Sequence, residues 1–396
     1  PKFIAICNIK SRKMGRVREG NERVLHARLS DAKFFWEEDC QNKLSHWVED
    51  LKEVSFHAQL GTLYEKTLRL KKLSASIAAV LGWERSRISR AAHICKADLA
   101  SQMVGEFPEL QGIMGYHYSR QQREPKEVSI AIAEHYLPKH AGDTLPASRA
   151  GKILALADKI DTLTGIFSAG EGPTGEKDPY ALRRAALGVI RILVEKKIPL
   201  DIVELVDLSI STYNDNGRKI EQDTRQRVSQ FIVDRYHGYF GSTGFTKDEI
   251  NAVLELGIIP PLDFYRRLRA VSKFRRSRSA ESLSEANKRV SNIIRKSGQD
   301  IPLEIDSTLF ECSAEETLAA SLVEVSATLT PLIERGDYAR ALAQLALLRE
   351  PVDRFFTDVM VLTDDSLVRT NRLALLNQLS QLLVVVADIS KLQPPD

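Results

Sequence analysis

The chain has 396 residues, of which 43% are hydrophobic and 28% charged, and its formal net charge at pH 7 is +3. This composition is typical of a globular protein, and the length predicts several modules because a single core stops growing at roughly 250 to 300 residues. No apolar run approaches the roughly 18 residues that a membrane span needs. The four cysteines form no CxxC pair. The composition therefore argues against a membrane protein, a disulfide scaffold and a cysteine zinc site.

Residues 1–57 combine a strand-like run with a helical segment. The run from Phe3 to Ile9 is apolar and rich in isoleucine, which predicts a short β-strand. A helix is expected from Ser30 onward. The chain begins at Pro1 without a methionine, so we expect it to start inside a larger protein, with residues 1–57 as the end of a truncated domain.

Residues 58–168 have the pattern of a helical module rich in titratable side chains. These are His93, Asp98, His117, His135 and Asp158. Their order resembles the HD phosphohydrolases, in which an early His, an adjacent His-Asp pair and a late Asp bind a divalent metal. Aligned in this way, the His-Asp pair falls on Cys95-Lys96, and a lysine repels a cation. We therefore expect a degenerate, metal-free HD-like domain in which Asp98 and Asp158 hydrogen-bond to or pair with Lys96. A metal-dependent phosphohydrolase is the alternative.

Residues 169–300 are predicted to be a helical body. A glycine-rich turn follows the helix around Gly151, and Asp178-Pro179 is expected to begin the next helix, with the aspartate accepting from free N–H groups. The glycines of 237–244 predict a loop. Thr246 and Glu249 then have the spacing of a capping box. No GxxxxGK[ST] or GxGxxG motif occurs, so a phosphate-cradling loop has no support.

A basic segment ends this body. Residues 262–300 contain eleven Lys or Arg against four Asp or Glu, whereas residues 301–396 contain seven against fifteen. Apolar residues recur at helical spacing within it, at Phe264, Leu268, Val271 and Phe274, which leaves the charges on the outer face. Further along the segment, a stripe of basic and polar side chains at helical spacing can contact successive phosphates of a nucleic-acid backbone. It comprises Lys288, Asn292, Arg295 and Gln299, with Arg289 beside it. The alternative is an ordinary solvated face.

Residues 301–396 are predicted to be a bundle of four helices, at 315–336, 337–348, 351–361 and 364–383. In the last helix Arg369 and Arg372 lie three residues apart on one face, while Leu373 and Leu376 turn inward. A guanidinium can donate to O2 and N3 of an unstacked cytosine, and Asn371 can serve either edge. Alternatively, the arginines pair with Asp364 or Asp365.

The adjacent Phe355 and Phe356 also have two interpretations. They can stack on bases, as aromatic rings do in RNA recognition, or they can pack in the core. We expect at least one of the two to be a core residue.

Three stretches together resemble one family. The run PTGEKDPYALRRAALG and the run ANKRVSNI are similar to the β subunit of bacterial-type glycyl-tRNA synthetase. The run EPVDRFFTDVMVLTDDSLVRTNRLALL resembles the DALR-type anticodon-binding domain that this β subunit shares with arginyl-tRNA synthetase. The resemblance implies a mainly α, multi-domain protein that recognises tRNA(Gly) without catalytic residues of its own. It also implies tRNA contacts at Lys288, Arg289, Asn292, Arg295, Arg369, Asn371 and Arg372.

The same resemblance implies the partners. In this family the class II catalytic α subunit, or an α-like half fused upstream, uses ATP and Mg²⁺ to activate glycine, so this chain should need no cofactor. An oligomeric enzyme in a bacterial cytoplasm or a plastid stroma is expected. A purely helical scaffold remains a third hypothesis, because the net charge of −8 in residues 301–396 disfavours RNA.

Overall fold

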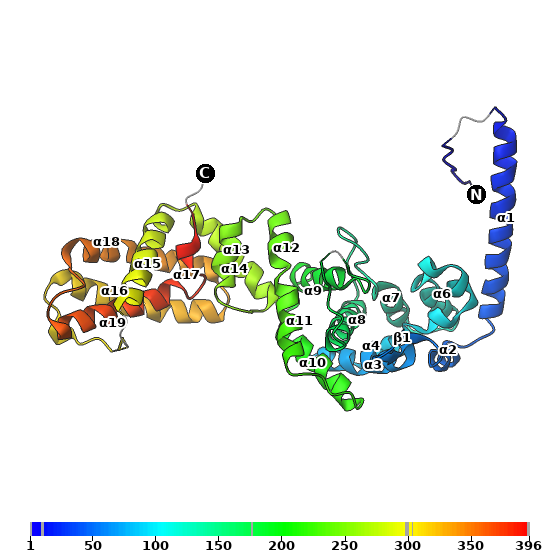
Figure 1. The fold of residues 1–396 in the computed structure, drawn as a ribbon, viewed down its shortest axis with the longest axis horizontal. Coiled ribbons are helices and arrows are strands. Elements are labelled where there is room, and N and C mark those ends of the chain that lie inside the picture. Colours follow the sequence, from blue (N-terminus) through cyan, green and yellow to red (C-terminus); the bar gives the residue numbers. More distant parts are fainter. Residues whose placement is uncertain (1, 9–11, 176, 298–300, 303, 394–396) are drawn as a thin grey trace. The chain divides into compact units, whose positions relative to one another are not determined.

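A computed structural model describes residues 2–8, 12–175, 177–297, 301–302 and 304–393. The described chain is mainly α-helical, as predicted, and it divides into two compact units (Figure 1). Unit 1 comprises residues 1–192 and 206–225, and unit 2 comprises residues 193–205 and 226–396. The four divisions expected from the sequence remain a prediction. Among the described residues, no helix is long and apolar enough to cross a membrane.

The N-terminal elements differ from the expectation. Residues 2–8 form no strand, and Ile9 lies outside the described residues. A strand needs a partner for its backbone groups, and the only sheet in the described part of the chain pairs β1 (Ser55–His57) with β2 (Gly61–Thr62). Helix α1 (Met14–Asp39) begins well before Ser30. Ion pairs one turn apart, such as Arg18 with Glu22 at 3.6 Å, favour this longer helix.

Unit 1 contains a set of mutually packed helices. In chain order, its elements after α1 are α2 (Leu44–Asp50), β1, β2, α3 (Leu63–Val80), α4 (Ser86–Ile94), η1 (Ala97–Ala100), α5 (Gln102–Glu106), η2 (Pro108–Leu110), α6 (Ile113–Gln121), α7 (Lys126–Glu134) and α8 (Arg149–Ser168). Helix α8 contacts α3, α4 and α7. It is buried along most of its length because its residues are apolar on nearly every side, and Ser148 caps its first turn.

Helix α9 (Leu182–Glu195) shows how the glycine-rich turn works. The carboxylate of Asp178 accepts from the N–H groups of Leu182 and Arg183 at 2.8 and 3.0 Å, which confirms its predicted capping role. The helix nevertheless begins three residues after Pro179, because Ala181 has a φ of 54°, outside the right-handed helical region. Two further helices complete the middle of the chain, α10 (Ile202–Asp215) and α11 (Asp223–Val233).

In unit 2, the expected loop at 237–244 is mostly helix α12 (Tyr236–Ser242). Tyr236 and Phe240 are fully buried against Phe264, and this burial outweighs the low helix propensity of glycine. The capping box of Thr246 and Glu249 is confirmed at the start of α13 (Lys247–Leu254).

The basic segment forms α14 (Pro261–Arg275) and α15 (Arg278–Ser297). Its predicted apolar stripe, from Phe264 to Phe274, is buried. The last elements are η3 (Ser307–Leu309), α16 (Ser313–Glu334), α17 (Tyr338–Leu345), η4 (Ala346–Leu348), α18 (Arg349–Asp358), α19 (Ser366–Leu383) and η5 (Ile389–Lys391). Helix α15 contacts both α18 and α19, so the end of the basic segment belongs to the C-terminal bundle.

Candidate nucleic-acid interface

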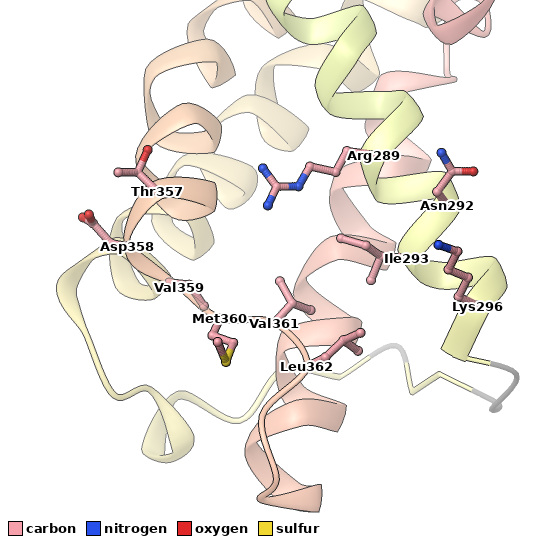
Figure 2. A pocket seen from close by; sticks show the side chains of 10 residues that line it. All are labelled: Arg289, Asn292, Ile293, Lys296, Thr357, Asp358, Val359, Met360, Val361 and Leu362. Carbon is pink, nitrogen blue, oxygen red and sulfur yellow. The ribbon is translucent and has the colours of Figure 1, made fainter.

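A cavity of about 840 Å³ opens beside helix α15 in unit 2 (Figure 2). One wall comes from α15, and the other comes from the end of α18 and the segment that follows it. Its lining residues are Arg289, Asn292, Ile293, Lys296, Thr357, Asp358, Val359, Met360, Val361 and Leu362. Two cations, one acid and several apolar side chains therefore meet in one cavity.

Arg289 reaches across the cavity from α15 toward α18 (Figure 2). Its guanidinium carbon lies 4.1 Å from the centroid of the Phe356 ring, within the range of a cation–π interaction. Phe356 is half-buried, whereas Phe355 is fully buried. The prediction that at least one of this pair is a core residue is confirmed. Phe356 thus orients the Arg289 side chain while leaving the outer edge of its guanidinium accessible.

The predicted basic stripe is exposed, but the cavity uses only part of it. Lys288, Asn292 and Arg295 are all exposed on α15, and Arg295 donates to the side-chain oxygen of Asn292 at 2.9 Å. Of these three, only Asn292 lines the cavity. Gln299 lies outside the described residues.

Sequence reasoning missed Lys296. This residue lies seven positions after Arg289, two helical turns on, and it therefore shares the Arg289 face and lines the cavity. The spacing was visible in the sequence, but the lining side of the helix was not.

Two apolar side chains at this cavity were also missed. Met360 is 76% exposed and Leu362 is 57% exposed, although both are large and hydrophobic. They lie in the segment that connects α18 to α19. A surface that combines accessible cations with exposed apolar atoms can bind a phosphate and the face of a base at the same time.

The structure corrects the expectation for Arg372. Its side chain is only 6% exposed, and its Nε donates to the carboxylate of Glu315 at 2.8 Å. A second nitrogen pairs with Glu311 at 2.7 Å, and a third contact reaches the carbonyl of Met360 at 3.0 Å. With its donors used internally, Arg372 is not placed to read a base. Its contact with Met360 instead fixes the backbone of the segment that lines the cavity.

Asn371 is likewise internal, being 5% exposed. Its amide accepts from the N–H of Asp306 at 2.8 Å and donates to the carbonyl of the same residue at 2.9 Å. This pair of bonds anchors the backbone at Asp306, just before η3. A base contact by Asn371 would leave both backbone groups of Asp306 without these partners, which costs free energy.

Arg369 is half-buried and donates to the carbonyl of Thr363 at 2.8 Å. The alternative pairing of the arginines with Asp364 or Asp365 is not what the structure shows for the described contacts. Asp365 instead caps α19 by accepting from the N–H groups of Leu367 and Val368. Leu373 and Leu376 are buried, as predicted.

Lys96 is buried within residues 58–168, the part of the chain that we expected to be HD-like. Nζ of Lys96 lies 3.3 Å from the carboxylate of Asp158, which confirms this predicted ion pair. Lys66 adds a second contact to Asp158 at 3.2 Å. Asp98 behaves differently from the expectation, because its carboxylate accepts from the N–H groups of Gly112 and Gly115 at 2.6 and 2.9 Å. Burial raises the pKa of Asp98 to about 6.

The histidines of this region do not gather into a ligand set. Within the part of the chain that the structure describes, no group of three or more His, Cys, Asp or Glu side chains could hold a metal ion. His135 is completely buried, and burial together with the charge of Lys96 lowers its pKa well below the ordinary value. The absence of a bound metal stays a prediction that solution analysis must test.

Comparison with known proteins identifies the family. A family model described as glycyl-tRNA synthetase beta subunit matches residues 1–255, and a DALR anticodon binding domain model matches residues 283–396. Relatives named glycine–tRNA ligase beta subunit include those of Pasteurella multocida, 45% identical over 396 residues, and Chromohalobacter salexigens, 45% identical over 393 residues. Each alignment covers 99% of this chain and 57% of the relative. The chain therefore belongs to the glycyl-tRNA synthetase beta subunit family.

Proposed function

We propose that this chain is a tRNA-binding, non-catalytic part of a glycine–tRNA ligase. The proposal draws on family membership, although the chain spans only 57% of the length of its relatives. The observation that carries it is the cavity beside α15, where Arg289 and Lys296 face exposed apolar side chains inside the region that matches the anticodon-binding model. The catalytic α subunit, or an α-like half of the same enzyme, would bind ATP and Mg²⁺ and transfer glycine. The compartment would be a bacterial cytoplasm or a plastid stroma.

The net negative charge of residues 301–396 is no obstacle in this arrangement. At physiological salt, dissolved ions screen the interaction between charges that are further apart than the Debye length of about 8 to 10 Å. A local pair of cations therefore dominates the field inside the cavity, provided that nearby acids are paired. Glu311 and Glu315 share one cation, Arg372, so part of their negative charge is neutralised within the bundle. Asp358 is the acid that lines the cavity itself, and its carboxylate can accept from the exocyclic amine of a base.

The test is binding of tRNA(Gly) to the double variant Arg289→Gln, Lys296→Gln. We expect weaker binding, with a slope of log K against log[salt] that is smaller by roughly 1.4 to 1.8, since two phosphate charges are no longer neutralised. The matched control is Arg340→Gln, which removes a 79% exposed arginine from the same unit but away from the cavity.

A second tRNA separates phosphate contacts from base reading. This second tRNA is tRNA(Gly) in which the cytosines at the second and third anticodon positions are both replaced. If the double variant loses affinity equally for both tRNAs, the cavity contacts phosphate, and if it loses more for the native one, the cavity reads bases. Unchanged affinity and unchanged salt slope for both tRNAs would show that the cavity is not part of the interface.

A further inference from the structure

A second cavity, of about 510 Å³, lies in unit 1 and is separate from the proposed nucleic-acid interface. Its wall includes Tyr136 after α7, Asp158, Lys159 and Thr162 of α8, and Arg184 of α9. The volume falls within the range of roughly 300 to 1,000 Å³ that is usual for small-molecule sites. The question is which ligand chemistry these residues favour.

Buried cations outnumber buried acids behind this cavity. Asp158 is shared by Lys66 and Lys96. Asp161 is shared by Lys66 at 2.9 Å and Arg69 at 2.8 Å. Each of these carboxylates therefore already serves two cations. Asp98 is held by backbone N–H groups, as described above.

Lys159 adds a further charge that no carboxylate contacts closely among the described interactions. It is only 7% exposed, and its ammonium group donates to the carbonyl of Leu137 at 2.7 Å. Burial lowers the pKa of Lys159 to about 8, and the charges of Lys96 and Lys66 act in the same direction, although Asp158 opposes them. Four buried cations, including Lys159, thus face three acids, Asp98 included. A bound anion would offset this excess.

The rim of the cavity presents two exposed cations. Lys139 and Arg184 line it together with the exposed Glu109, and Asp143 accepts from the backbone N–H of Lys139 at 2.7 Å. The guanidinium of Arg184 is held by a bond to the carbonyl of Lys139 at 2.9 Å, which leaves other N–H groups available to a ligand. Inner and rim groups together, with Asp98 and Asp143 counted as ionised, carry an excess of about one positive charge, which favours an anionic ligand such as a phosphate monoester.

Tyr136 supplies an independent indication. Its hydroxyl is buried and has no hydrogen-bond partner within the described residues. The centroid of its ring lies 4.0 Å from Nζ of Lys96. A buried hydroxyl without a partner costs free energy, and a ligand oxygen would satisfy it. Tyr180 contributes a second aromatic ring to the same wall. An aromatic wall of this kind is suited to stacking with a nucleobase.

We infer that this cavity binds the 5′-phosphate of a nucleotide without a metal ion and without cleaving it. The ligand is either a free mononucleotide or the 5′-phosphorylated end of an RNA, because both offer the same phosphate and the same adjoining base. The inference goes beyond the proposed tRNA contact at α15 and does not depend on it.

Isothermal titration of the chain in the presence of EDTA tests the inference. The probes are AMP, adenosine, and one tetraribonucleotide with either a 5′-phosphate or a 5′-hydroxyl. We expect AMP to bind and adenosine not to bind, and AMP to be recovered unchanged. Tighter binding of the 5′-phosphorylated oligonucleotide than of AMP would identify an RNA end, and the reverse order would identify a free nucleotide. Equal binding of AMP and adenosine, or no binding of any phosphorylated probe, overturns the inference.

Variants connect binding to the cavity. Arg184→Gln alters an exposed rim residue and should weaken AMP binding about tenfold, the scale of one charge-assisted hydrogen bond. Arg183→Gln is the matched control, since that neighbouring arginine donates to the carbonyl of Gly175 and does not line the cavity. Lys159→Met should weaken binding further, with folding checked by circular dichroism. AMP affinity that is unaltered in Arg184→Gln and in Lys139→Gln would place the bound nucleotide elsewhere.

Discussion

Replacing Arg372 with alanine tests the corrected role of this arginine most directly. The side chains of Arg372 and Glu315 are 6% and 1% exposed, and they are joined by a contact of 2.8 Å. Removing one partner of a buried ion pair strands the other charge, at a cost of about 3 to 5 kcal/mol. Glu315 also belongs to the capping box of α16, where its carboxylate accepts from the N–H of Cys312.

The electrostatics of Glu315 give the pH dependence. Burial opposes ionisation, but hydrogen bonds from Arg372 and from the N–H of Glu311 and Cys312 hold the pKa of Glu315 below its ordinary value. A carboxyl group with a lowered pKa in the folded state contributes stability above its unfolded pKa and loses it as the pH falls. The destabilisation by Arg372→Ala should therefore be largest near neutral pH and shrink in acid.

The assay is urea denaturation of the wild type, Arg372→Ala, Glu315→Gln and the double variant, at pH 7 and pH 4. We expect the two single changes to be strongly non-additive, as residues in one buried pair are. Arg369→Ala is the matched control on the same helix, because it removes a half-buried arginine with one bond to a carbonyl. Wild-type stability in Arg372→Ala, together with lost discrimination between the two anticodons, would refute the reasoning and restore a base-reading arginine.

Three further predictions concern other parts of the chain. Burial raises the pKa of Asp98 to about 6, so around pH 5 the folded state binds a proton that the unfolded state has already released. The stability of the wild type relative to Asp98→Asn should therefore fall by on the order of 3 kcal/mol between pH 4 and pH 7. Parallel pH profiles of the two proteins in urea denaturation would contradict this. Gly165→Ala places a methyl group against the hydroxyl of Tyr213 and should lower stability by about 1 to 3 kcal/mol, measured by thermal unfolding, unless Tyr213 moves freely. Lys288→Gln should reduce the salt slope of tRNA binding by at most about 0.9 without changing anticodon discrimination, and a selective loss for the native anticodon would count against it.

The sequence alone was sufficient for features that depend on neighbours along the chain. The spacing of Phe264, Leu268, Val271 and Phe274 indicated the buried face of α14, and Thr246 with Glu249 indicated the start of α13. The lysine at position 96 predicted an ion pair with Asp158 because a cation in that place needs an acid. The first two inferences hold because helical periodicity and capping depend only on residues close in sequence. The third came from comparing the order of residues with that of a known family.

The tertiary structure decided which charged groups are free. Arg372 and Glu315 are 57 residues apart, and Asn371 and Asp306 are 65 apart, so no periodic pattern linked them. Arg372 and Arg289 look equally available in the sequence, yet packing buries the first between acids and leaves the second over an aromatic ring at a cavity. Burial makes the difference, because a charge removed from water must find its partner within the fold, whereas a charge at a cavity remains available to a ligand.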